Sequence, residues 1–389
     1  MPFAAALSTQ ADTAKALGEV LSRTREQLQG PVDLGLVFFS PHHAARAKTI
    51  SHEITRQLTL RCLLGCPGES IVGNEREVEN GPALSLWLGR WSDQVSISPF
   101  HLTVEDTSEG YSLLGWPDDF FSVDPAQAVV LTLADPFTFP VDDYLRKINE
   151  EVRGLRVMGG MASGARQPGE NVLLLDDRMV DQGAVSVLLQ GPVQVRSVVS
   201  QGCRPIGRPL VVTKAKDNLV LEVGGQTPLA YLQELWPRLE PRDQELVQQG
   251  LHVGRVTSEY RAVFDRGDFL IRNVLGLDRN TGALAITERV RVGQTIQFHV
   301  RDAATADEDL HALLRIDRDR ARQAAAGALL FTCNGRGTRL FQQPSHDAGV
   351  VAQEMGALPL AGFFAQGELG PVGGENFIHG FTASVVLFE

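Results

Sequence analysis

The chain has 389 residues, 43% hydrophobic and 21% charged, which is typical of a globular protein with about two domains. Its formal net charge of −11 argues against partners such as nucleic acid and anionic membranes, which favour basic patches. The four scattered cysteines, the start without a basic and apolar leader, and the absence of a long apolar run predict a cytoplasmic protein with reduced thiols.

The first elements along the chain come in the order strand, helix, strand, glycine-rich loop and returning strand. They are predicted at LGLVFFS (34–40), at a helix over 42–58, at RCLLGCPGESIVG (61–73) and at ALSLWL (83–88). The same order recurs at AVVLTLADP (128–136), at a helix over 141–152, at LRVMGGMASG (155–164) and at AVSVLLQG (184–191). This recurrence indicates an internal repeat.

Two further copies are predicted in the second half of the chain. The third has a charged loop and comprises LVLEV (219–223), a helical stretch over 228–249, LHVGRVTSE (251–259) and TIQFHV (295–300). Within it, LDRNTGALAI (277–286) predicts a hairpin. The last comprises AGALLFTCNGRG (326–337), a helix over 346–355, LPLAGFFAQGELGPVGG (358–374) and the strand GFTASVVLF.

Glycine spacing supports four copies and fixes their grouping. Gly65, Gly159, Gly254 and Gly362 are separated by 94, 95 and 108 residues. We therefore predict a mixed α+β protein of two domains, 1–195 and 196–389, each built from two β-α-β-β units. Because few residues separate the two strands around each glycine loop, the sheets should be mixed or antiparallel and covered by helices.

The turn TCNGRGTRLF (332–341) is the first candidate ligand site. Asn334, Gly335 and Gly337 suit a turn that presents backbone N–H groups to an anion. Arg336 could add a bidentate clamp for a carboxylate or phosphate. The alternative is a tight turn capped by solvated arginines.

The segment 362–380 is the second candidate, because it carries five glycines between Gly362 and Gly374. Phe363 and Phe364 could supply apolar walls, while Glu368 and Asn376 could supply polar contacts. A connection that needs glycine only to turn is the alternative interpretation. We expect the loop at 362–376 and the turn at 332–339 to face each other across a cleft.

A catalytic or metal site is not predicted. Cys333, His346 and Asp347 invite a cysteine-nucleophile hypothesis, but adjacent residues at a helix start are not expected to orient one another. The adjacent His42 and His43 lack a third metal ligand nearby, and no phosphate-binding glycine motif is present, so no cofactor is expected.

Several of these motifs resemble the FIST family. The similarity is carried by LVFFSPHH and LLGCPGESIVGNEREVENGPALSL in the first half, and by GALLFTCNGRGTRLF and LAGFFAQGELGPVGGENFIHGFTASVVLF in the second. The resemblance implies an N-terminal and a C-terminal FIST domain and a sensory role in signal transduction, with a small ligand such as an amino acid.

These patterns leave two main functional hypotheses. The first is a non-catalytic sensor of an amino acid or similar small carboxylate, whose output passes through a signalling partner or through self-association. The second is an enzyme with a site centred on Cys333 or on a carboxylate in the C-terminal glycine loops. An interaction scaffold without a small-molecule pocket is a third alternative.

Overall fold

The computed structural model describes residues 2–108, 110–260, 264 and 266–389. The fold is mixed α+β with several mixed sheets, as the sequence predicts. The chain divides into two compact units. Unit 1 comprises residues 1–200, 310–378 and 382–389, whereas unit 2 comprises residues 201–309 and 379–381.

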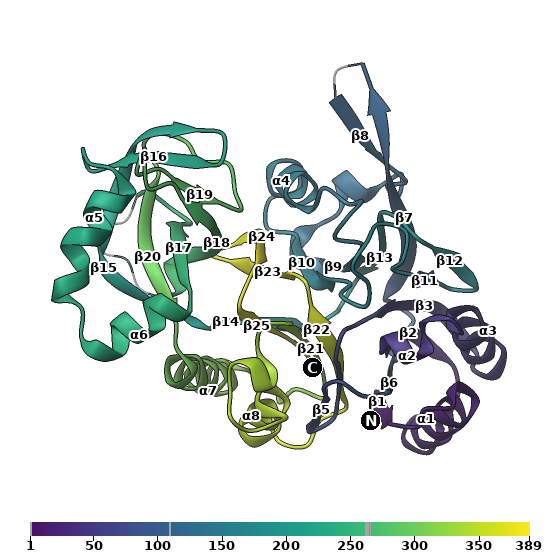
Figure 1. Ribbon diagram of the computed structural model, residues 1–389. Helices are drawn as coiled ribbons and strands as arrows, with labels where there is room; N and C mark the ends of the chain where they lie inside the picture. The colour runs from purple at the N-terminus through teal and green to yellow at the C-terminus, as the bar shows by residue number, and fades with distance from the viewer. Residues whose placement is uncertain (1, 109, 261–263, 265) are drawn as a thin grey trace. The chain divides into compact units, whose positions relative to one another are not determined.

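Unit 1 contains three sheets with the same strand plan, formed by three segments of the chain (Figure 1). Segment A contains β1 (Phe3–Ser8), α1 (Thr13–Gln27), β2 (Val32–Phe39), α2 (Pro41–Ala44), α3 (Ala47–Gln57), β3 (Leu60–Pro67), β4 (Ile71–Gly73), β5 (Arg76–Val78) and β6 (Leu84–Gly89). Segment B contains β7 (Ser96–Thr107), β8 (Gly110–Leu114), η1 (Phe120–Ser122), η2 (Pro125–Gln127), β9 (Ala128–Ala134), α4 (Val141–Glu151), β10 (Arg156–Met161), β11 (Leu173–Leu175), β12 (Arg178–Val180) and β13 (Ala184–Gln190). Segment C contains β14 (Val195–Gln201), α7 (Ala303–Arg320), β21 (Gly327–Cys333), η5 (Gly337–Arg339), α8 (His346–Met355), β22 (Leu360–Ala365), β23 (Glu368–Val372), β24 (Glu375–His379) and β25 (Thr382–Phe388).

In each segment, two parallel strands are joined by a helical crossover. The parallel pairs are β2 with β3, β9 with β10, and β21 with β22. The returning strand of each segment then runs antiparallel to the first strand of the pair, as β6, β13 and β25. It separates that strand from a leading strand, which is β1, β7 or β14.

The short hairpin of each segment joins the sheet of a different segment. The β4–β5 hairpin of segment A pairs with β22 of segment C, and β11–β12 of segment B pairs with β3 of segment A. The β23–β24 hairpin of segment C pairs with β10 of segment B. The exchange is therefore cyclic, and none of the three sheets is complete without a strand from a neighbouring segment.

Alternating side chains give each sheet two buried faces. On β21, Leu329 and Phe331 belong to a central core shared by all three sheets, whereas Ala328 and Leu330 pack toward α7 and α8. Segments A and B follow the same pattern. In segment A, α1 and α3 cover the outer face of the sheet, and in segment B, α4 covers it. Figure 1 shows these helices on the outer side of their sheets.

Three predicted repeat glycines occupy equivalent positions in these parallel pairs. Gly65 pairs with Val37, Gly159 with Thr132, and Gly362 with Leu330. A Cβ atom at Gly159 or Gly362 would lie 1.9 or 1.8 Å from the carbonyl oxygen of its partner, and one at Gly65 would lie 2.7 Å from it. These glycines therefore allow close backbone approach within the sheet.

Unit 2 is a closed barrel with strand order β15-β16-β19-β18-β17-β20. Its elements are β15 (Cys203–Lys216), β16 (Leu219–Val223), α5 (Pro228–Leu235), η3 (Trp236–Arg238), α6 (Pro241–Gln249), β17 (Leu251–Val256), η4 (Arg266–Asp268), β18 (Phe269–Leu277), β19 (Leu284–Ile286) and β20 (Thr295–Arg301). The predicted hairpin at 277–286 is confirmed by the antiparallel pairing of β18 with β19.

The third predicted copy lies in this barrel and has a different plan. Gly254 on β17 pairs with Ile271 and Gln297 in antiparallel strands, and β16 is not a neighbour of β17. The regular glycine spacing at this position therefore does not mark the same topology.

The predicted boundary near residue 195 lies close to the point where the chain first passes from unit 1 to unit 2, between 200 and 201. The chain returns to unit 1 at Leu310, so the C-terminal strands pack with the N-terminal half. None of the helices in the described part of the chain combines the length and apolar character needed to cross a membrane.

Candidate functional site

The first candidate turn begins where β21 ends. Asn334 N–H donates to the carbonyl of Ala365 at the end of the parallel strand β22, at 2.9 Å, and Arg336 N–H donates to the carbonyl of Cys333 at 2.8 Å. Gly337 has φ +59, and a Cβ there would lie 2.7 Å from the Phe364 ring. Carboxyl ends of parallel strands are a common location for ligand sites.

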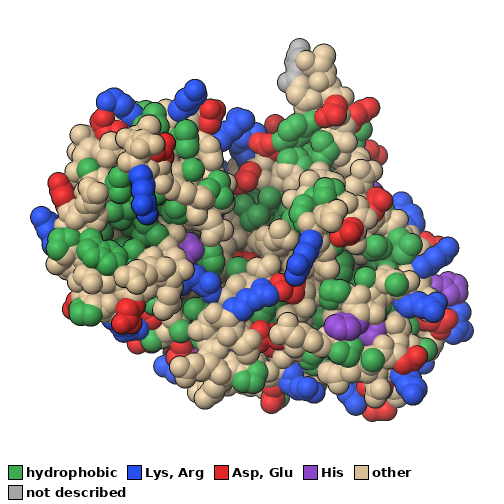
Figure 2. All heavy atoms as spheres, viewed as in Figure 1, with side chains coloured by type: hydrophobic (Ala, Val, Ile, Leu, Met, Phe, Trp, Pro, Cys, Tyr) green, Lys and Arg blue, Asp and Glu red, His purple; other side chains and the backbone are tan. Residues whose placement is uncertain are grey.

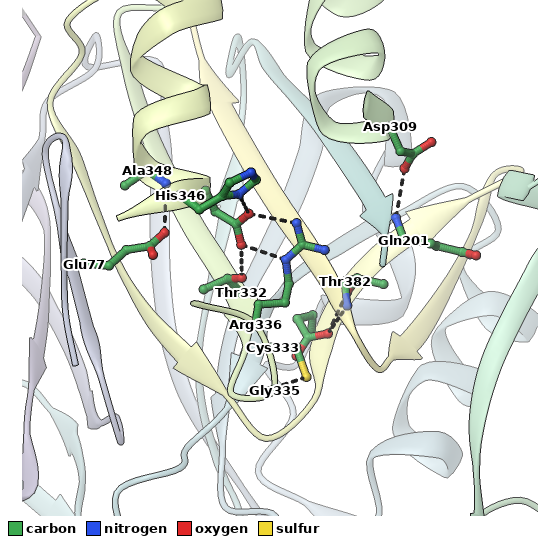
Figure 3. Close-up of polar contacts among 12 residues, drawn as sticks. Glu77, Gln201, Asp309, Thr332, Cys333, Gly335, Arg336, His346, Ala348 and Thr382 are labelled. Atoms are coloured by element: carbon green, nitrogen blue, oxygen red, sulfur yellow. Dashed lines mark hydrogen bonds and ion pairs between the residues drawn. The ribbon is translucent and has the colours of Figure 1, made fainter. Parts of the chain in front are cut away.

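Arg336 is fully buried and forms a bidentate ion pair with Asp347, which is also buried, at the start of α8. Nε lies 2.7 Å from Oδ2, and Nη2 lies 2.8 Å from Oδ1. The Thr332 hydroxyl donates to Asp347 Oδ2 at 2.5 Å (Figure 3). Arg336 and these hydrogen bonds hold the pKa of Asp347 well below its usual range, although burial acts in the opposite direction. The charge of Arg336 is therefore matched within the fold.

Asp347 also contacts His346, although we expected that these neighbours at a helix start would not orient one another. His346 Nδ1 lies 2.9 Å from Asp347 Oδ1, and the imidazole stacks on Phe341. The expectation was wrong, since the imidazole and the carboxylate are within hydrogen-bond distance in the first turn of α8.

Residues in and next to the β4–β5 hairpin of segment A contact this turn and the start of α8. Glu77 Oε1 accepts from Ala348 N–H at 2.9 Å, in the first turn of α8, as Figure 3 shows. Glu77 is buried, and burial together with the negative charge of Asp347 raises its pKa to about 8. Glu79 accepts from the backbone and hydroxyl of Thr338, and Glu69 forms an ion pair with Arg339.

A second cluster lies around Cys333, which is 8% exposed. We call Cys333, Gly335, Glu368 and Thr382 the strand-end site. Gly335 N–H donates to Cys333 Sγ at 3.4 Å, and Figure 3 shows these two residues close to Thr382. Glu368 Oε2 accepts from the Thr382 hydroxyl at 2.6 Å and from its backbone N–H at 3.2 Å.

Glu368 is the least satisfied group of the strand-end site. Its side chain is fully buried, and Oε1 has no hydrogen-bond partner among the described residues. Burial raises its pKa to about 8, while the Thr382 hydrogen bonds, the positive charge of Arg336 and the nearby Cys333 thiol act in the opposite direction. The carboxyl group is therefore largely protonated at neutral pH.

The remaining predicted ligand residues are part of the packed structure. Phe363 lies in the central core and Phe364 packs on the α8 side of β22, both almost fully buried. Asn376 bonds to Val157 N–H, to the Leu155 carbonyl and to Asn149. The predicted loop at 362–374 consists mainly of strands β22 and β23, which pair with neighbouring strands.

The two candidate segments meet where β21 and β22 end side by side, and the cleft expected between them stays a prediction. Asn334 and Gly335 are half-buried at the end of the turn, whereas Arg336 and Gly337 are buried beneath it. Glu77, Asp347 and Thr382 were not among the predicted site residues. Asp347 had a sequence signal, because it is an acidic residue in the first turn of a helix that closely follows a strand-ending turn. Glu77 and Thr382 had none, because pairing between strands distant in sequence brings them to this region.

Two family models match consecutive parts of the sequence. The FIST N domain matches residues 33–226, and the FIST C domain matches residues 228–371. This chain belongs to the FIST family. The boundary between the two FIST matches falls after β16, inside the barrel of unit 2, and Cys333 and Glu368 lie within the FIST C match.

Full-length relatives are present in mycobacteria. An uncharacterised protein of Mycobacterium tuberculosis (strain ATCC 25618 / H37Rv) is 41% identical over 391 residues, covering 100% of both chains. An uncharacterised protein of Mycobacterium bovis (strain ATCC BAA-935 / AF2122/97) is 40% identical, covering 100% of this chain and 99% of the relative. This FIST protein is therefore similar to these relatives over its whole length.

Proposed function

We propose that this FIST protein is a non-catalytic sensor that binds a small amine-bearing ligand, such as an amino acid, at the strand-end site. FIST domains are associated with sensing in signal transduction, which supports the general role. The observation that carries the location is Glu368, a buried carboxyl group with an oxygen that has no hydrogen-bond partner among the described residues.

The chemistry of Glu368 favours a cationic ligand group. Burial of a carboxylate without a matching charge is costly, which is why the pKa of Glu368 is raised to about 8. A ligand ammonium group next to Oε1 would supply the missing donor and the missing charge, and would convert Glu368 to its ionised form. Entry is expected past Asn334 and Gly335, which are half-buried at the end of β21.

The carboxylate of an amino-acid ligand would need a partner other than Arg336. Our sequence-based hypothesis assigned the guanidinium group to this task, but Asp347 occupies it in a bidentate ion pair. A small amine without a carboxylate is therefore as good a candidate as an amino acid. A ligand screen that contains both classes distinguishes them.

The proposed output is a signalling partner or self-association in the cytoplasm. Acidic and basic side chains are interspersed over the face seen in Figure 2, and the net charge is −11. Both features support a protein or small-molecule partner over nucleic acid or an anionic membrane.

A thermal-shift screen of amino acids, small amines and small carboxylic acids tests this proposal. We expect an amine-bearing compound to raise the Tm, because a ligand at a hundredfold excess over Kd stabilises the native state by about 2.7 kcal/mol. Glu368→Gln should abolish the shift, whereas Glu375→Gln, an exposed position on β24, should retain it. A shift that persists in Glu368→Gln would place the ligand elsewhere.

An enzyme centred on Cys333 is the second candidate function. It is favoured by a thiol that accepts an N–H bond and that affects the raised pKa of the Glu368 carboxyl group. Our proposal predicts that Cys333→Ala retains ligand binding in the same screen. If Cys333→Ala instead abolishes a turnover reaction of the bound compound, the enzyme hypothesis replaces the sensor.

A further inference from the structure

The thiol of Cys333 differs from the other three cysteines in its surroundings. Cys62, Cys66 and Cys203 lie in hydrophobic cores with exposures of 0 to 1%. Burial raises the pKa of the Cys62 and Cys66 thiols far above the usual value, which makes them unreactive. Cys333 instead lies at a strand end, is 8% exposed, and precedes two half-buried residues.

Two polar groups lie close to the Cys333 sulfur. The N–H of Gly335 points to Sγ at 3.4 Å, and the Arg336 guanidinium is close enough for Cys333 to affect its pKa. A neighbouring cationic side chain lowers the pKa of a thiol and so favours the nucleophilic thiolate. This geometry is independent of any ligand at the strand-end site.

Glu368 adds a proton donor beside the same sulfur. Its carboxyl group is buried, and one oxygen has no hydrogen-bond partner among the described residues. Because its pKa is raised to about 8, it carries a proton at neutral pH. A protonated carboxyl group beside a thiolate supplies what peroxide cleavage requires, namely a nucleophile and an acid for the leaving oxygen.

We propose that Cys333 is a peroxide-sensitive thiol and that Glu368 is its proton donor. The Cys333 thiolate attacks one oxygen of hydrogen peroxide, and the O–O bond breaks as an S–O bond forms. The leaving hydroxide takes the Glu368 proton to form water, and the proton lost earlier by the thiol restores Glu368. The net reaction converts one thiol and one peroxide to one sulfenic acid and one water.

Oxidation at this position changes the strand-end site directly. The sulfenic acid would form within the strand-end site, to which Glu368 also belongs. The proposal goes beyond ligand sensing, because it requires only peroxide and the residues around Cys333.

The test compares two reagents on the native full-length chain, with modification of each cysteine measured by mass spectrometry. Hydrogen peroxide is used with a dimedone trap for sulfenic acid, and iodoacetamide is used separately. We expect Cys333 to react at least about tenfold faster than Cys62, Cys66 or Cys203 with both reagents. Equal protection of all four cysteines would overturn the proposal.

The variant Glu368→Gln separates the proton donor from simple accessibility. Peroxide oxidation of Cys333 should slow by about a hundredfold, since general acid catalysis typically contributes that much or more. Iodoacetamide alkylation should change by less than about threefold, because iodide leaves without a proton. Glu375→Gln is the control, and continued protection of the other three cysteines shows that the variant is folded.

A parallel change in both reactions in Glu368→Gln would contradict the role of Glu368. The failure of this experiment would leave the thermal-shift result intact, because the ligand screen uses neither peroxide nor iodoacetamide. A ligand-induced rise in Tm without peroxide oxidation of Cys333 therefore rejects only the thiol proposal. Peroxide oxidation of Cys333 without any ligand-induced rise in Tm rejects only the sensor proposal.

Discussion

At the scale of single residues, Arg336 shows how burial changes the meaning of a sequence motif. From the turn CNGRG, the sequence predicted that Arg336 either clamps an anionic ligand or is a solvated arginine of a tight turn. In the structure, Arg336 and Asp347 are both fully buried and paired. We therefore assign the arginine to stability.

Arg336→Met should lower the free energy of unfolding by about 3 kcal/mol or more, since it leaves Asp347 buried without its cation. Chemical denaturation at pH 7 measures this loss. The double variant Arg336→Met/Asp347→Leu should recover a large part of it, because no unpaired charge remains. A single variant as stable as the wild type would show that the pair is not formed.

Glu368 should give stability a distinct dependence on pH. Its pKa is raised from an ordinary 4.5 to about 8, so between these values the folded state binds a proton more tightly than the unfolded state. This group therefore lowers stability as pH rises from about 4.5 to about 8, and its effect is constant above that.

The comparison of Glu368→Gln with wild type isolates this effect. The variant should gain stability relative to wild type as pH rises from about 5 to about 8, measured by urea denaturation at several pH values. Glu77, whose pKa is also raised to about 8, is present in both proteins, so its contribution cancels. A stability difference that is independent of pH would contradict the raised pKa of Glu368.

At the scale of elements, local patterns identified the strand–helix–strand order of each segment but not the sheet partners of the strands. The glycine spacing correctly placed Gly65, Gly159 and Gly362 at equivalent positions. The hairpins after these glycines were misassigned, because a hairpin such as β23–β24 pairs with a strand from another segment, and such pairing leaves no periodic signal. For the same reason, Asn376 was taken for a ligand contact although it bonds to Val157 and Leu155.

The spacing also extended to Gly254, where it was misleading. This glycine makes room for the His299 ring, since a Cβ would lie 2.3 Å from Cε1 of that ring. A glycine that accommodates a side chain and one that accommodates a backbone carbonyl look identical in a sequence. Only the pairing partner distinguishes them.

Gly362→Ala should therefore be severely destabilising, by about 3 kcal/mol or more, because its Cβ would overlap the Leu330 carbonyl. The matched control is Gly349→Ala in α8, where a Cβ has open space within 4 Å and helix propensity favours alanine by about 1 kcal/mol. Thermal unfolding of both variants measures the contrast. Similar Tm values for the two would indicate that β21 and β22 are not in close parallel contact.

At the scale of the whole molecule, the segments that pack together are not contiguous in sequence. Unit 1 combines the first 200 residues with the C-terminal strands, while the barrel strands of unit 2 all lie between Cys203 and Arg301. The predicted domains, 1–195 and 196–389, remain a prediction about which pieces fold alone. The structure favours a different division, because β4 and β10 take strands from segment C as neighbours.

Truncation distinguishes the two divisions. A fragment of residues 1–195 should lack cooperative unfolding, whereas a fragment of residues 201–309 should unfold cooperatively as an isolated barrel. Circular dichroism with thermal denaturation measures both. A stable, cooperative 1–195 fragment would instead support the division predicted from sequence.

Proton release on ligand binding tests the proposed sensor most directly. The amine-bearing compound with the largest thermal shift is titrated calorimetrically at pH 7, in buffers with different ionisation enthalpies. With a pKa of about 8, Glu368 should release about 0.9 proton per bound ligand as it becomes ionised. Glu368→Gln should bind weakly and release none. Tight binding without proton release, or with release unchanged in Glu368→Gln, would contradict an amine site at Glu368.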